Sequence, residues 1–278
     1  MNQKGGIELL ILVIVIIASF LLTGGFTVYQ NSTAPQNSTN QTVELVQGSP
    51  QPANQTLQFK TLEFSTKLCS NMAVDFLVDN SGSMDSGNKL TQLKEGLLQF
   101  TSGFPDASVV ALQKFAVTPS EVIPFSYYKD VKNQFSQYVN SMTANNATYT
   151  KDAFGLAKLS LDAAILKYPN YKFTLIFISD GVPETTQSDL TCIPNYCRTN
   201  TCQCFAPEQD PTDIANEIKQ EGIRIITISY VDKSDAKIES ILENLMTNVA
   251  SSPNDYYKAP DSNQISSILS QISTKLCQ

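Results

Sequence analysis

The chain has 278 residues, of which 42% are hydrophobic, and it carries a formal net charge of −7. This length and composition allow one full hydrophobic core with accessory segments, whereas the acidic balance and the lack of a Lys/Arg cluster exclude an ordinary nucleic-acid-binding surface. The sequence contains no histidine, which removes Ser-His-Asp and Cys-His catalysis and the commonest zinc ligand. We therefore expect a binding protein and not an enzyme.

Residues 1–25 predict a membrane anchor. Residues 6–25 are mostly apolar and carry a single charge, Glu8, and a helix of this length crosses the hydrocarbon core of a bilayer, which is about 30 Å thick. Lys4 is the only basic residue in the preceding segment 1–5, so the positive-inside rule puts that segment in the cytoplasm and everything after Gly25 outside the cell. A cleaved secretory signal is the competing interpretation, but no A-x-A-like site ends the apolar run.

The start "KGGIE" also resembles the prepilin-type leaders of archaea and bacteria. The resemblance implies that a peptidase cuts after Gly5 and that the apolar helix stays on the mature protein. Glu8 would then be the third mature residue, whereas pilins usually carry Glu at the fifth. A plain signal anchor is the alternative.

Residues 26–64 predict a flexible stalk outside the cell. They are rich in Asn, Gln, Ser, Thr and Pro and poor in large apolar side chains, so the segment cannot offset the entropy of ordering itself. Chance could produce a single sequon in such a composition, but several close together favour a glycosylated spacer. The sequons begin at Asn31, Asn37, Asn40 and Asn54.

Residues 65–278 predict one α/β domain, because apolar runs of strand length alternate with segments of helical period. We expect strands at Met72–Asp79, Ser108–Val117, Glu121–Ser126, Lys172–Ser179, Ile223–Val231 and Tyr256–Lys258. We expect helices at Lys89–Gly103, Val131–Met142, Asp152–Tyr168, Asp213–Glu221, Ala236–Val249 and Ser262–Lys275. The second and third strands are too close in sequence for a crossover helix and should form an antiparallel hairpin. The predicted fold is a doubly wound, mostly parallel six-stranded sheet with one antiparallel edge strand and helices on both faces.

Acids and hydroxyls follow two of the buried strands. The run "VDFLVDNSGSM" ends its strand with Asp79, and Gly82 lets the loop bend so that Asp79, Ser81 and Ser83 converge. Ligands of open α/β sheets sit beyond the carboxyl ends of the strands, and hard oxygen ligands in this number suit Mg²⁺.

Two further segments should bring oxygen atoms to the same edge. "FTLIFISDG" ends another strand with Asp180, and "NNATYTKDAFGLAK" puts Thr148 and Thr150 at the mouth of a helix. Each motif alone would be an ordinary turn. Together, in this order between strands of the right pattern, they predict a metal site.

At these residues the chain resembles the von Willebrand factor type A domain family, from about Cys69 to Cys277. The metal-ion-dependent adhesion site of that family combines an Asp-x-Ser-x-Ser loop, a Thr of a second loop and the Asp of a later Asp-Gly pair. Lys151 departs from the Gly that many members have after the second Thr, but the departure leaves the proposed ligands in place. The matching residues are Asp79, Ser81, Ser83, Thr148 and Asp180.

The resemblance implies that these residues hold Mg²⁺ or Mn²⁺. Ser81 and Ser83 would bind the ion directly, and the other residues directly or through water. An Asp or Glu of a protein partner would fill the open coordination position. Asn146 begins a sequon that ends at Thr148, so a glycan there would crowd the site.

Six cysteines on an exported chain imply disulfides. The family resemblance implies a bridge between Cys69 and Cys277. The other four lie in a polar insertion, residues 182–210, where Cys202 and Cys204 are too close to pair comfortably. Two pairings remain there, with a zinc knot as a rival that the extracellular setting and the spacing disfavour. The pairings are Cys192–Cys202 with Cys197–Cys204, or Cys192–Cys204 with Cys197–Cys202.

Three functions are open at this point. The first is a cell-surface adhesion or ligand-binding protein, anchored in the membrane as a single-pass protein with its C-terminal domain outside. The alternative is a structural or tip subunit of a type IV pilus-like filament, whose partners would include pilin-like subunits. The third, an intracellular motor-coupled type A domain like those of metal chelatases, is disfavoured by the anchor and the cysteines.

Overall fold

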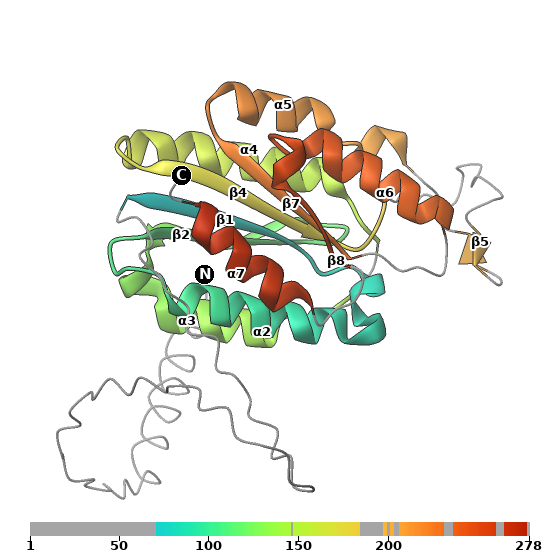
Figure 1. Ribbon diagram of the computed structural model, residues 1–278, viewed down its shortest axis with the longest axis horizontal. Coiled ribbons are helices and arrows are strands. Elements are labelled where there is room, and N and C mark those ends of the chain that lie inside the picture. The colour runs from blue at the N-terminus through green and yellow to red at the C-terminus, as the bar shows by residue number, and fades with distance from the viewer. Residues whose placement is uncertain are drawn as a thin grey trace, which may run out of the picture. The chain divides into compact units, whose positions relative to one another are not determined.

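Six strands form one sheet in the order β3-β2-β1-β4-β7-β8 (Figure 1). Neighbouring strands pair in parallel except β2 and β3, which are antiparallel and leave β3 at one edge. This architecture confirms the predicted fold class. The strands are β1 Met72–Asp79, β2 Val109–Phe115, β3 Ser120–Tyr127, β4 Lys172–Ser179, β7 Arg224–Tyr230 and β8 Tyr256–Ala259.

The computed structural model describes residues 71–145, 147–183, 197–198, 201–202, 206–230, 236–259 and 264–276. All of them belong to one compact unit, residues 60–278. The predicted membrane span, the stalk and its four sequons lie outside the described residues. Within the described ranges no helix combines the length and apolarity needed to cross a bilayer.

Three helices cover each face of the sheet (Figure 1). On one face lie α2 Lys89–Ser102, α3 Tyr128–Ser141 and α7 Ile265–Lys275. On the other lie α4 Thr150–Lys167, α5 Thr212–Gln220 and α6 Ala236–Val249. Short 3₁₀ turns are η1 Gly82–Asn88, η3 Pro207–Gln209 and η4 Pro253–Asp255, and β5 Cys197–Arg198 pairs with β6 Thr201–Cys202 in a separate hairpin.

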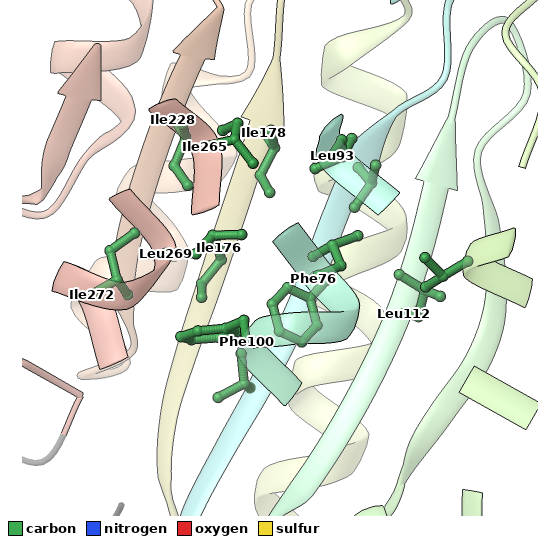
Figure 2. Packing of buried hydrophobic residues seen from close by; sticks show 14 of the residues in the cluster. Phe76, Leu93, Phe100, Leu112, Ile176, Ile178, Ile228, Ile265, Leu269 and Ile272 are labelled. Atoms are coloured by element: carbon green, nitrogen blue, oxygen red, sulfur yellow. The ribbon is translucent and has the colours of Figure 1, made fainter. Parts of the chain in front are cut away.

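The two cores follow from the alternation of side chains along each strand. In β1, Phe76 and Val78 face the α2 side while Leu77 faces the α4 side, and all three are fully buried. Phe76 meets the ring of Phe100 edge to face, with centroids 5.8 Å apart (Figure 2). Since both faces are covered, the central strands consist mostly of apolar residues, which is why their bounds could be predicted closely.

A glycine sets how closely α2 approaches α7. A Cβ added at Gly96 would lie 2.6 Å from Ile265 Cγ2 and 3.0 Å from Leu269 Cδ1. Only a residue without a side chain fits this contact, so the two helices pack at short range.

A buried acid–amide pair spans β1 and β2. Asp75 and Gln113 are both 0% exposed, and Gln113 Nε2 donates to Asp75 Oδ2 at 2.8 Å. Burial, aided by the charge of Glu121, raises the pKa of Asp75 well above its ordinary value. Asp75 Oδ1 and Gln113 Oε1 have no hydrogen-bond partner, so a proton on Asp75 lowers the cost of burying this carboxyl group.

The structure differs from the predicted elements mainly where a strand passes directly into a helix without a turn between them. Helix α3 begins at Tyr128, three residues before the predicted start, because β3 passes directly into it. The Tyr128 N–H is bonded to Ser108 O at 2.8 Å, which fixes this junction. The turn η1 and the β5–β6 hairpin were not predicted.

Candidate functional site

The carboxyl ends of β1 and β4 bring two of the predicted acids together. The strands are parallel, with Val78 opposite Ile178, so the residues that follow, Asp79 and Ser179, lie side by side. Asp79 is 0% exposed and Asp180 is 7% exposed. Two carboxyl groups therefore share the edge of the sheet with little access to water.

Asp79 is held by two hydrogen bonds. Its Oδ1 accepts the backbone N–H of Ser81 at 2.7 Å, and its Oδ2 accepts the hydroxyl of Ser179. Burial and the neighbouring charge of Asp180 raise the pKa of Asp79 to about 7, although these hydrogen bonds work in the opposite direction. A cation at this edge would relieve both the burial cost and the repulsion.

The two loop serines connect the two strand ends. The hydroxyl oxygens of Ser81 and Ser83 are 3.1 Å apart, and Ser83 Oγ donates to Asp180 Oδ1 at 2.6 Å. The turn η1 fixes this arrangement, because the Met84 N–H is bonded to Ser81 O at 3.1 Å and Met84 is fully buried. Asp79, Ser81, Ser83 and Asp180 thus form one connected cluster.

A third segment is fastened to this cluster through its backbone. Asn145 N–H donates to Asn80 O at 2.8 Å, and Asn80 Nδ2 donates to Thr143 O at 3.1 Å. The Tyr149 N–H is bonded to Ala116 O at 2.9 Å. The loop before α4 therefore lies against the loop after β1.

Thr148 joins the site through its close approach to Gly181. A Cβ built on Gly181 would lie 3.1 Å from Thr148 Oγ1 and 3.8 Å from Ser83 Oγ. Thr148 is 1% exposed. The structure therefore brings all five predicted site residues to one place, and Gly181 leaves the room for the threonine hydroxyl.

Sequence reasoning missed two polar side chains of this site. Ser179 supports Asp79, and Lys89 Nζ donates to Asp180 Oδ2 at 2.6 Å. Ser179 had a detectable signal, because it precedes Asp180 at the end of a strand predicted to be buried. Lys89 had none, because nothing in its spacing indicates that α2 would turn it toward Asp180.

A profile of the von Willebrand factor type A domain matches residues 74–271, more than half of the chain. The chain belongs to the von Willebrand factor type A domain family. No curated protein sequence matches it closely enough to count as a relative.

Solved structures share this type A fold at low sequence identity. The pilus adhesin SpaC from Lactobacillus rhamnosus GG is 15% identical with a TM-score of 0.60, over 74% of this chain and 30% of that one. The vWF domain of the type V pili tip protein Mfa5 from Porphyromonas gingivalis is 13% identical with a TM-score of 0.58, over 75% of this chain and 96% of that one. Proximal thread matrix protein 1 from the mussel byssus, in a structure with zinc in its metal-ion-dependent adhesion site (MIDAS) motif, is 15% identical with a TM-score of 0.54. The match covers 76% of this chain and 47% of that one. The match thus spans less than half of the first and third of these proteins.

The donor set of this type A domain fits a hard divalent cation. It offers hydroxyl and carboxylate oxygens, which are the ligands that Mg²⁺ and Mn²⁺ prefer. In the described part of the chain no three His, Cys, Asp or Glu residues group as metal ligands, so any ion at this edge would depend on the hydroxyls. Two buried carboxylates supply the negative charge.

A hollow of about 510 Å³ borders the site of the type A domain. Asn80 and Asn145, which join two of the site loops, form one side of it, and Lys114 is its charged residue. The lining residues are Asn80, Lys114, Ala116, Val117, Thr118, Ser120 and Asn145.

The cysteine-rich insertion leaves and rejoins the type A domain close to the site. Ala206 N–H donates to Pro183 O at 3.0 Å, which ties the two flanks together. In the hairpin, Cys197 lies opposite Cys202, a register that is compatible with the predicted Cys197–Cys202 pairing. Cys69, Cys192, Cys204, Cys277 and Asn146 lie outside the described residues, so every disulfide and the glycan stay predictions.

Proposed function

We propose that the type A head binds an acidic group of a protein partner through a divalent cation, Mg²⁺ or Mn²⁺. The observation that carries the proposal is the convergence of oxygen atoms from three separate segments, joined by the Ser83–Asp180 hydrogen bond of 2.6 Å. When bound, the cation would supply an electrophilic position for a carboxylate of the partner. The residues proposed to hold it are Asp79, Ser81, Ser83, Thr148 and Asp180.

The chain's own residues explain why such a site would bind and not catalyse. Asp79 and Asp180 provide the charge, and Ser179 keeps the Asp79 carboxylate turned toward the loop. The sequence has no histidine, which removes the side chain that most often serves as the general base in hydrolysis. We propose adhesion or ligand binding, with the head outside the cell on its predicted anchor and stalk.

A second function is a subunit or tip of a surface filament. Similarity of fold to a pilus adhesin and to a pili tip protein supports it, as does the prepilin-like start of the sequence. Cleavage after Gly5 separates the two functions. Intact-mass spectrometry of the protein from its native membrane would favour the filament subunit if residues 1–5 are missing, and the simple anchored adhesin if they are retained.

The direct test is capture of partners from cell envelopes by the full chain in detergent. The wild type should retain a partner in Mg²⁺ and release it in chelator, and the variant with Ser81→Ala and Ser83→Ala should retain none. Ser102→Ala with Ser136→Ala is a matched control, because both hydroxyls only make exposed hydrogen bonds to the backbone of their own helices, α2 and α3, and neither contacts a site residue. Equal capture by the site variant, with or without chelator, would refute the proposal.

A further inference from the structure

Lys89 is a cation already present in the site. Its Nζ lies 2.6 Å from Asp180 Oδ2, and the side chains of Lys89 and Asp180 are only 12% and 0% exposed. The other oxygen of Asp180 accepts the Ser83 hydroxyl. Both oxygens of this buried carboxylate are thus bonded within the protein.

The backbone around Lys89 fixes where the ammonium can reach. Gly87 and Asn88 both adopt left-handed backbone conformations, with φ of 62° and 60°, and this kink ends η1 and starts α2 at Lys89. The Tyr230 hydroxyl donates to Lys89 O at 3.2 Å from within the core. The position of Lys89 is therefore fixed by the backbone kink before it and by the hydrogen bond to its carbonyl oxygen.

The charge of Lys89 is unfavourable at its position in α2. A cation at the first helical position is opposed by the positive end of the helix dipole, and the first turn of α2 contains no acid to compensate. A residue that is locally unfavourable and still buried against a carboxylate has its reason in that contact. The contact here belongs to the proposed metal site.

We propose that Lys89 is an internal counter-ion that regulates loading of the site with a divalent cation. Without a metal it neutralises Asp180, so the empty head stays folded. The ammonium repels an incoming metal ion and lowers the negative charge of the site from two to one, which weakens the attraction for the ion. Lys89 thus lowers the affinity for the cation and makes loading depend on the cation concentration outside the cell. This inference rests on the proposed function.

The test compares Lys89→Gln with Lys94→Gln in the full chain in detergent. Lys94 lies on the same helix, and its Nζ donates to Asn140 O at 3.0 Å in an exposed hydrogen bond, so its variant loses the same charge away from the site. Calorimetric titration with Mn²⁺ should give an affinity on the order of 10- to 100-fold tighter for Lys89→Gln than for the wild type. Lys94→Gln should match the wild type, and Lys89→Arg, which keeps the charge, should stay close to it.

The melting temperature in chelator is a second readout. Lys89→Gln should melt below the wild type there, and the gain on adding Mn²⁺ should exceed that of the wild type. If Lys89→Gln does not fold in chelator, both proteins are titrated in a stabilising osmolyte in which the metal-free variant is folded, and an affinity for Mn²⁺ no tighter than that of the wild type under the same conditions overturns the proposal.

The outcomes separate this inference from the proposed function. Binding of Mn²⁺ with equal or weaker affinity in Lys89→Gln would overturn the role of Lys89 and leave the metal site intact. Binding by Lys89→Gln alone would support the role of Lys89 but contradict metal-dependent adhesion by the wild type. Binding by neither protein would overturn both.

Discussion

Replacing Asp75 with Asn should stabilise the domain, and by an amount that grows with pH. Asp75 is fully buried and its pKa is raised well above the ordinary value by burial and by Glu121. Above that pKa the folded protein must keep an uncompensated charge inside the sheet. An Asn amide is neutral at every pH, so the variant buries no charge, and its Oδ1 can accept the Gln113 Nε2 hydrogen bond that Asp75 Oδ2 accepts in the wild type.

The pH window follows from the direction of the shift. Because the folded pKa lies above the unfolded value of about 3.9, folding takes up a proton between the two values. The stability contributed by Asp75 is therefore fully present below about pH 4 and is lost as the pH rises through the folded pKa. The loss is about 1.4 kcal/mol for each pH unit within that window. The difference between Asp75→Asn and the wild type should be small at pH 4, rise with this slope and then level off.

Urea denaturation at a series of pH values from 4 to 8 measures this difference. Asp79 also has a raised pKa, but it is present in both proteins, so its contribution cancels in the stability difference between them. Asp106→Asn is the matched control, because Asp106 is exposed and its replacement should shift stability by less than about 0.5 kcal/mol at any pH. A variant that is less stable than the wild type at pH 8, or a difference that does not change with pH, would refute the account of the buried pair.

Three further predictions concern packing and the support of the site. Gly96→Ala should destabilise the domain by about 1 kcal/mol despite the gain in helix propensity, because the new Cβ would lie 2.6 Å from Ile265 Cγ2. Gly155→Ala, whose Cβ would have nothing within 4 Å, should stabilise it by about 0.5–1 kcal/mol. If urea denaturation gave the reverse order, α2 and α7 would not be in close contact. Phe76→Ala should cost about 3–5 kcal/mol, and a loss below about 1 kcal/mol would contradict its full burial against Phe100. Ser179→Ala should weaken Mn²⁺ binding about 10-fold in calorimetry by freeing the Asp79 carboxylate, and an unchanged affinity would remove Ser179 from the site.

The sheet could be predicted from the sequence because its central strands are buried on both faces. β1 and β4 are mostly apolar, with Asp75 as the one charged residue inside β1 and Thr174 as a polar residue inside β4, and their predicted bounds agree with the structure. The start of α3 could not be predicted, because Tyr127 and Tyr128 carry no turn residue between the strand and the helix.

The five site residues could be predicted because each lies just after a strand or just before a helix. The carboxyl ends of neighbouring parallel strands meet at one edge, so Asp79 and Asp180 had to be close. Lys89 and the Asp75–Gln113 pair could not be found in this way. Their contacts depend on the kink at Gly87 and on the register of β1 against β2, and neither is encoded in a short motif.

The most direct test of the central claim is anomalous X-ray diffraction from crystals of the protein grown in Mn²⁺. The account predicts one anomalous peak per molecule among the side-chain oxygens of Ser81, Ser83 and Asp180, and loss of that peak when both serines are replaced by alanine. Crystals of well-folded protein in millimolar Mn²⁺ with no peak at this edge of the sheet, or with a peak that survives the double replacement, would contradict it.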